Sequence, residues 1–212
     1  YRSNAQSRVL EHALFNAALP YRVYGGLRFF ERQEVKHALA YLRLVANADD
    51  DGAWLRIVNF PTRGVGARSI EQVQEVARQR GITLWAAACA NTVSGKSGAS
   101  IGAFVNLIES MRGATAGLAL PEAIAHVVDA SGLRQHYRNE REGADRLENL
   151  DELINAATTF VEERDIEPAT DGEAEPDDLT AFLAHAALEA GERQALAGAD
   201  ALQLMTVHSA KG

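Results

Sequence analysis

The sequence predicts a mainly α-helical fold, an α/β fragment in which a small α/β lobe is interrupted by a large all-helical insertion. Apolar residues recur with the three-to-four-residue spacing of amphipathic helices along most of the 212 residues. Strand-like patterns occur only at 21–24 and at 200–207, toward the two ends of the chain. We therefore expect the two ends to build one lobe and the helices between them to form the insertion.

The first half of the chain alternates helices with turns. Apolar spacing predicts helices over 9–17, 35–45, 54–58, 70–77 and 83–90. Pro20 ends the first of these helices, and the sequence of Ser69–Gln72 has the spacing of a capping box at the start of the fourth. Gly81 ends that fourth helix.

The second half begins with a loose stretch rich in small residues. Residues 94–100 are expected to form a loop at a domain boundary, and 195–200 a second boundary. Further helices are predicted over 101–111, 121–130, 147–163 and 179–190. The segment 162–178 combines Pro, Gly and many carboxylates and is expected to be a solvated or disordered loop.

Composition limits the class of protein. Hydrophobic residues make up 47% and charged residues 24% of the chain, as in globular proteins. No apolar run approaches the roughly 18 residues that span a bilayer, and no signal peptide is recognisable, so no membrane contact and a cytoplasmic location are expected. Cys89 is the only cysteine, which excludes an internal disulfide and a cysteine-based zinc site in this sequence. The six histidines show no metal-binding spacing, so no metal site is predicted.

Charge is distributed unevenly. The net charge is −8, but residues 1–80 carry +4 and residues 81–212 carry −12. A basic face can therefore exist in the first part of an acidic chain.

A nucleotide-binding P-loop is absent from this sequence, although Gly95-Lys96-Ser97 matches the end of one. The full pattern requires a glycine six residues before the lysine, where this chain has Ala90, and a preceding strand, where the residues 85–88 read as a helix.

The two ends carry the most specific motifs. YRSNAQSR at 1–8 and TVHSAKG at 206–212 resemble motif IV and the first part of motif V of the UvrD/Rep/PcrA group of superfamily 1 DNA helicases. The same resemblance extends, in order, to YGGLRFFERQEVK, PTRGVG, RLENL and FLAHAALE at 24–36, 61–66, 146–150 and 182–189. No Met precedes Tyr1 and the last strand runs into its loop, so we expect a piece of a larger protein.

The resemblance implies a domain division and an activity. Residues 1–95 would be the first part of the second RecA-like, P-loop-NTPase-type lobe, 96–198 a helical accessory insertion, and 199–212 the return to the lobe. The whole protein would be an ATP-dependent 3′→5′ helicase that moves along single-stranded DNA and unwinds duplex in repair. ATP and Mg²⁺ would bind between this lobe and another that supplies the P-loop, so this chain alone would be inactive. Expected partners are single-stranded DNA, junctions with duplex, and unidentified repair proteins.

The nucleotide is assigned to the first two residues. An aromatic ring followed by a guanidinium suits stacking on a base and bidentate binding of a phosphate. The resemblance implies that Tyr1 stacks on adenine and that Arg2 reaches the γ-phosphate as a catalytic arginine finger.

DNA contact is predicted for several basic and small residues. Arg28, Arg32 and Lys36, spaced by four, are expected to line one helix face and its entry, with intrahelical pairing to Glu31 and Glu34 as the alternative. The glycines at 64 and 66 and the helix expected after them suit a hairpin that binds a phosphate. The resemblance adds Arg146 in the insertion and residues of the motif V loop. These further candidates are Arg63, Gly64, Gly66, Arg68, Arg146, Thr206, His208, Ser209 and Lys211.

Two other classes of function stay open at this point. The negative charge and the missing P-loop favour a non-enzymatic helical module that binds DNA or protein. A Rep-type or PcrA-type motor, or the helicase subunit of a recombination nuclease, would share the same motifs.

Overall fold

The computed structural model describes residues 1, 6–24, 28–90, 93–141, 143–166, 176–191, 201–207 and 210. It is mostly helical, which confirms the predicted mainly-α class. The helices are α1 (Ser7–Asn16), α2 (Gln33–Ala46), α3 (Asp51–Ile57), α4 (Ala67–Arg80), α5 (Leu84–Cys89), α6 (Gly95–Thr115), α7 (Leu120–Ala130), α8 (Leu133–Arg138), α9 (Gly143–Ile166) and α10 (Asp178–Gly191). A 3-10 helix, η2 (Phe29–Glu31), precedes α2, and the strands are β1 (Tyr21–Tyr24) and β2 (Leu202–Met205).

The chain folds into two compact units. Unit 1 contains residues Tyr1–Lys36 and Tyr137–Gly212, and unit 2 contains His37–His136. The division into 1–95, 96–198 and 199–212 expected from the sequence stays a prediction about functional parts.

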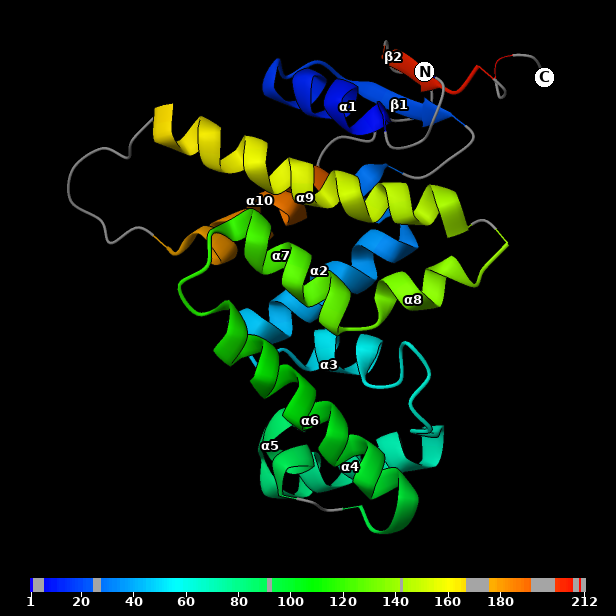
Figure 1. Cartoon of the computed structure of the whole chain (residues 1–212), viewed down its shortest axis with the longest axis vertical. Coiled ribbons are helices and arrows are strands. Elements are labelled where there is room, and N and C mark those ends of the chain that lie inside the picture. The colour runs from blue at the N-terminus through cyan, green and yellow to red at the C-terminus, as the bar shows by residue number, and fades with distance from the viewer. Residues whose placement is uncertain are drawn as a thin grey trace. The chain divides into compact units, whose positions relative to one another are not determined.

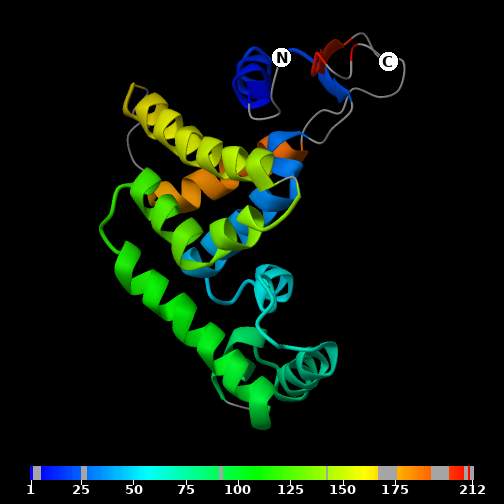
Figure 2. The same cartoon turned by 45° about the vertical axis from the view of Figure 1, so that its right-hand side comes forward.

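Unit 2 consists of helices that bury apolar side chains against one another. Its helices α4, α5, α6 and α7 pack in the order of the chain, as Figures 1 and 2 show from two sides. Trp54 of α3 is fully buried and meets the ring of Phe104 of α6 edge-on, with ring centroids 6.4 Å apart. Asp50 caps α3 by accepting a hydrogen bond from the Ala53 N–H at 2.8 Å.

Unit 1 combines a parallel strand pair with a helical core. Strands β1 and β2 pair in parallel with Tyr21 opposite Leu202. Near them, the aromatic rings of Phe30 (η2) and Phe182 (α10) lie 6.4 Å apart, and Phe160 (α9) packs on Phe182 at 5.5 Å. Phe30 is 4% exposed, so it belongs to the core of unit 1.

Helix α1 buries the face opposite to the one expected from its apolar residues. Ser7, Arg8 and Glu11 are buried, whereas Val9 is 58% and Leu10 44% exposed. The reason is that α1 packs near η2 through polar side chains, which find hydrogen-bond partners on other elements there.

Several element boundaries differ from the sequence prediction. The expected loop at 94–100 forms the first turns of α6. The capping box at Ser69 is wrong, because the N-cap of α4 is Gly66 and Ser69 is a buried residue inside the helix. The start of the acidic segment, 162–166, belongs to α9, and 167–175 lie outside the described residues.

We predict that Gly143→Ala destabilises the protein by about 1–3 kcal/mol, because overpacking forces the backbone to move. A Cβ atom at Gly143 would lie 2.0 Å from the carbonyl oxygen of Tyr137. The matched control is Gly113→Ala on α6, where nothing lies within 4 Å of the new atom and removal of a helix glycine stabilises by about 0.5–1 kcal/mol. Urea unfolding followed by circular dichroism measures both. Equal midpoints for Gly143→Ala and the unsubstituted protein would contradict the close approach.

Candidate functional site

Tyr1 lies beside β2, so the two terminal motifs meet in space. The Tyr1 amino group donates to the Met205 carbonyl at 3.1 Å, and the Val207 N–H donates to the Tyr1 carbonyl at 2.9 Å. On the other edge of β2, the Leu202 N–H donates to the Pro20 carbonyl at 3.0 Å. Alternate residues of a strand bond to opposite neighbours. Strand β2 therefore lies between β1 and the Tyr1 segment.

The Tyr1 side chain is half-buried and lies in a charged environment. Burial raises the pKa of the Tyr1 phenol, the Arg32 guanidinium opposes this rise, and Glu11 adds to it. A hydrogen bond with Ser7 also lowers the pKa of the phenol. Tyr1, the residue assigned to the nucleotide, therefore interacts electrostatically with Ser7 and Glu11 of α1 and with Arg32, which precedes α2. Arg2, the predicted catalytic residue, lies outside the described residues.

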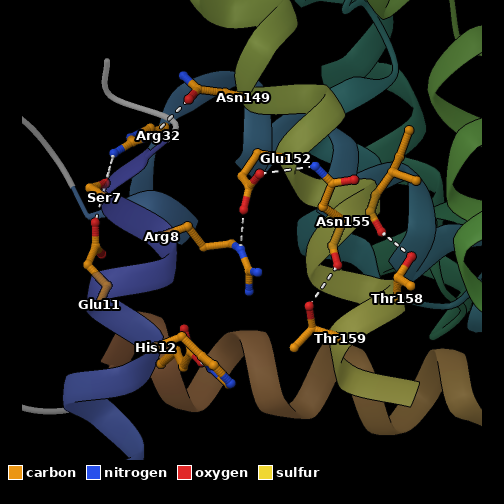
Figure 3. A network of polar contacts seen from close by, with 12 residues as sticks. Ser7, Arg8, Glu11, His12, Arg32, Asn149, Glu152, Asn155, Thr158 and Thr159 are labelled. Atoms are coloured by element: carbon orange, nitrogen blue, oxygen red, sulfur yellow. Dashed lines mark hydrogen bonds and ion pairs between the residues drawn. The ribbon is translucent and has the colours of Figure 1, made fainter. Parts of the chain in front are cut away.

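Arg32 forms the centre of a buried polar network (Figure 3). Its side chain is 8% exposed. One guanidinium nitrogen donates to the side-chain amide oxygen (Oδ1) of Asn149 at 2.8 Å, and the other donates to the Ser7 hydroxyl at 2.5 Å. The Glu11 carboxylate lies 3.9 Å away. Burial raises the pKa of Glu11, while Ser7, the Phe29 N–H and Arg32 lower it. Unit 1 therefore encloses two buried charges of opposite sign, the Arg32 guanidinium and the Glu11 carboxylate, which partly neutralise each other.

The network continues along α9. The Asn149 amide donates to the Glu34 carboxylate at 2.5 Å, and Arg146 lies 3.5 Å from the same carboxylate. Arg146 also pairs with Glu140 at 3.2 Å, and its guanidinium lies over the Tyr137 ring. Arg146, a predicted DNA contact, is therefore engaged in ion pairs within unit 1.

The predicted basic stripe does not lie along one helix. Arg28 and Arg32 have extended backbone conformations and precede α2, and only Lys36 lies inside that helix. Arg28 is 6% exposed, its guanidinium stacks over Tyr21, and it donates to the Glu189 carbonyl at 3.4 Å. Arg28 and Arg32 therefore lie at the entry of α2 and Lys36 on the helix itself, because the backbone is not helical at Arg28 and Arg32. Direct phosphate contact by Arg28 or Arg32 would require each to leave its buried partners.

In unit 2, Arg63 fixes the turn that precedes α4. Its guanidinium donates to the carbonyl oxygens of Ser131 at 2.9 Å, Pro61 at 3.1 Å and Ile57 at 3.2 Å, and to the Tyr41 hydroxyl. The guanidinium also lies over the ring of Phe104. Arg63 is thereby used to build the turn.

The same turn leaves its glycines at the surface. The Asn59 side-chain oxygen accepts from the N–H groups of Arg63 at 2.9 Å and Val65 at 3.1 Å. Gly64 adopts a left-handed conformation with φ 79°, and Gly66 is the N-cap of α4. Gly64, Gly66 and Arg68 are all exposed. A rigid, glycine-lined turn at the positive end of a helix is suited to a phosphate.

The remaining predicted positions lie at the end of the chain. Thr206 is half-buried, and its carbonyl accepts from the Ala210 N–H at 3.0 Å. His208, Ser209 and Lys211 lie outside the described residues.

Sequence reasoning missed the polar residues that position the site. Ser7, Glu34 and Asn149 lie inside the quoted motifs, but the motifs did not show that these residues contact one another or Arg32, because the partners are up to 117 residues apart in sequence. The only available hint was the polar face of α1 beside its apolar one.

The structure also bears on a P-loop at Lys96 and on membrane-spanning helices. Lys96 lies exposed in the first turn of α6, and the element described before it is helix α5, as the rejection of a P-loop requires. None of the helices in the described part of the chain has the length and apolar character needed to cross a bilayer.

Comparison with known proteins identifies relatives along the entire chain. The family model described as "UvrD-like helicase C-terminal domain" matches residues 1–212. DNA helicase II of Escherichia coli (strain K12) is 48% identical over 222 residues, and that of Haemophilus influenzae is 45% identical over 218 residues. ATP-dependent DNA helicase PcrA of Bacillus subtilis is 37% identical over 223 residues. Each alignment covers 100% of this chain but only 29% of the relative. The resemblance inferred from the motifs is confirmed.

We predict that Arg32→Ala destabilises the protein by about 3–5 kcal/mol, because it leaves the buried Glu11 carboxylate without its cation. Arg32→Lys should recover only part of this loss, since one ammonium group cannot reproduce the fork that binds both Asn149 and Ser7. The matched control is Arg43→Ala on the exposed face of α2, expected within about 0.5 kcal/mol of the unsubstituted protein. Urea unfolding measures all three. A loss for Arg32→Ala no larger than for the control would show that the network contributes little.

Proposed function

We propose that this chain, which belongs to the UvrD-like helicase C-terminal domain family, is the middle portion of an ATP-dependent 3′→5′ DNA helicase. The whole protein would move along single-stranded DNA and unwind duplex during repair in the cytoplasm. The observation that carries this proposal is the pairing of Tyr1 with β2, which places the start of the motif IV segment beside that of motif V. The names of the relatives, DNA helicase II and ATP-dependent DNA helicase PcrA, support it.

The nucleotide part of the proposal concerns Tyr1 and Arg2. Tyr1 would stack on the adenine of ATP, and Arg2 would reach the γ-phosphate, where charge grows during phosphoryl transfer. A half-buried ring at the edge of a parallel sheet fits such a role. Mg²⁺ and the P-loop lysine would come from another lobe, which supplies the metal chemistry and phosphate binding that these residues lack.

The DNA part of the proposal divides the predicted residues into two groups. Exposed groups would contact phosphates directly, since phosphate contact requires accessible donors. Among the predicted residues Gly64, Gly66 and Arg68 are exposed, Lys36 and Thr206 are half-buried, and His208, Ser209 and Lys211, which lie outside the described residues, are proposed for the same role. Arg28, Arg32, Arg63 and Arg146 would position that surface through the partners described above.

Single-stranded DNA and its junctions with duplex are the proposed substrates. The exposed glycines Gly64 and Gly66 would offer backbone N–H groups, which bind a phosphate without recognising a base. Binding through such groups suits a motor that must step along any sequence. DNA repair proteins are the proposed class of protein partner, and no individual partner is proposed.

We predict that Arg2→Ala in the full-length protein lowers kcat for DNA-stimulated ATP hydrolysis by about 10³-fold or more, with a smaller effect on nucleotide affinity. The reason is that an arginine finger binds most strongly in the transition state. The matched control is Lys96→Ala, expected to leave ATP turnover unchanged because Lys96 lies outside a P-loop. Steady-state kinetics measure both. An unchanged kcat in Arg2→Ala would remove the finger assignment.

We predict that Arg68→Ala weakens DNA binding by the full-length protein and lowers the slope of log K against log salt by about 1. Its unfolding midpoint should not change, because Arg68 is exposed. Arg63→Ala is the contrasting variant and should lower the unfolding midpoint, since five acceptor and ring contacts are lost. Fluorescence anisotropy at several salt concentrations and thermal unfolding measure the pair. An unaltered salt slope in Arg68→Ala would place the phosphate elsewhere.

A further inference from the structure

Two histidines that are far apart in sequence meet one buried carboxylate in unit 1. His12 on α1, His185 on α10 and Glu189 on α10 each offer a ligand atom, and these atoms lie within 4.8 Å of one another. His12 Nδ1 is 2.8 Å and His185 Nε2 is 2.9 Å from the same oxygen, Oε1 of Glu189. Figure 3 shows His12 lying between α1 and α10. Three potential ligands therefore converge from two helices.

The carboxylate at the centre is charged and inaccessible. Glu189 is 5% exposed. Burial alone would raise the pKa of Glu189, but hydrogen bonds from His12 and His185 outweigh it and lower the pKa to about 2. The hydrogen bond to Glu189 in turn raises the pKa of His12. An anionic carboxylate held between two imidazoles is a common donor set for a divalent transition metal.

Neighbouring groups hold both imidazoles in position. His185 and Glu189 are four residues apart and share one face of α10. The rings of Phe15 and Phe160 pack against His185 with centroids 6.1 Å and 5.2 Å away. These contacts fix the orientation of the imidazole before any ligand arrives.

A second carboxylate, that of Glu163, contacts His12 without being one of the three proposed ligands. Glu163 of α9 lies 3.0 Å from His12 Nε2, the nitrogen that points away from Glu189. The Asn16 amide lies 3.2 Å from the same nitrogen. Metal-bound histidines characteristically donate their other N–H to a carboxylate, which fixes the tautomer. Glu163 is placed for that outer role.

We propose that His12 Nδ1, His185 Nε2 and the Glu189 carboxylate bind one divalent transition-metal ion, with Zn²⁺ the best match and water as the fourth ligand. None of the three ligands is among the ATP or DNA contacts proposed above, and the metal site does not depend on the proposed function. Tetrahedral zinc with bonds near 2.0–2.1 Å separates its ligand atoms by about 3.3 Å. The two distances to the Glu189 oxygen, 2.8 and 2.9 Å, would widen by several tenths of an ångström, and the two imidazole nitrogens, which lie within 4.8 Å of each other, would adjust to the same spacing. A bound ion would tie α1 to α10.

The test is titration of the metal-free, full-length protein with Zn²⁺ by calorimetry. We expect one saturable site assigned to this cluster. His12→Ala and His185→Ala should each weaken binding by more than about 100-fold, and Glu163→Gln by about 10- to 100-fold, as outer-shell partners do. The matched control is His126→Ala, an exposed histidine of α7, which should leave binding unchanged.

Two further measurements on the unsubstituted protein keep the test independent of whether the variants fold. Zn²⁺ should raise the Tm, and EDTA should reverse the shift. Affinity should fall as pH is lowered, because protons compete with the metal for the imidazole nitrogens. Absence of saturable binding, absence of a Tm shift, or full affinity in a folded His185→Ala variant would each overturn the proposal.

Discussion

The buried guanidinium of Arg32 is the interaction on which the rest of unit 1 depends. It joins α1 through Ser7, α9 through Asn149, and the η2–α2 segment on which it lies. A guanidinium this deeply buried is tolerated only when its donors are satisfied and its charge is balanced. Polar residues are therefore required at positions where a core would otherwise be apolar. This requirement explains why α1 turns Ser7 and Glu11 inward and leaves Val9 exposed.

The same network reaches the residue assigned to the nucleotide. Tyr1 is held by backbone bonds to β2, while its phenol is affected by Arg32, Glu11 and Ser7. Under the proposed function, a base stacked on Tyr1 would thus be one contact away from a network that extends to α9 through Asn149. Hydrogen bonds from a planar guanidinium are directional. A displacement of Tyr1 would therefore change the electrostatic environment of Arg32 and Glu11 as well as its backbone bonds to β2.

Local patterns predicted the elements, whereas the partners of polar residues could not be predicted. The strand at 21–24, the helix end at Gly81 and the extent of α10 within one residue follow from local chemistry, which a single sequence contains. The terminal motifs likewise identified the family. The inverted face of α1 and the start of α6 at Gly95 were wrong, because tertiary contacts override local apolar spacing and small-residue composition. Likewise, His12 and His185 share a carboxylate only after the chain has folded.

The arginines illustrate why a count of basic residues overstates the positive charge that is free to meet a nucleic acid. A guanidinium has five donors in one plane, so it satisfies several carbonyl groups at once where the backbone turns. Arg63 does this for the carbonyls of Ile57, Pro61 and Ser131. The consequence is that the turn keeps its shape while Gly64 and Gly66 stay exposed without side chains that would block approach. In such a surface the arginine supplies rigidity, the glycines supply access, and the neighbouring exposed Arg68 supplies the charge that a phosphate would meet.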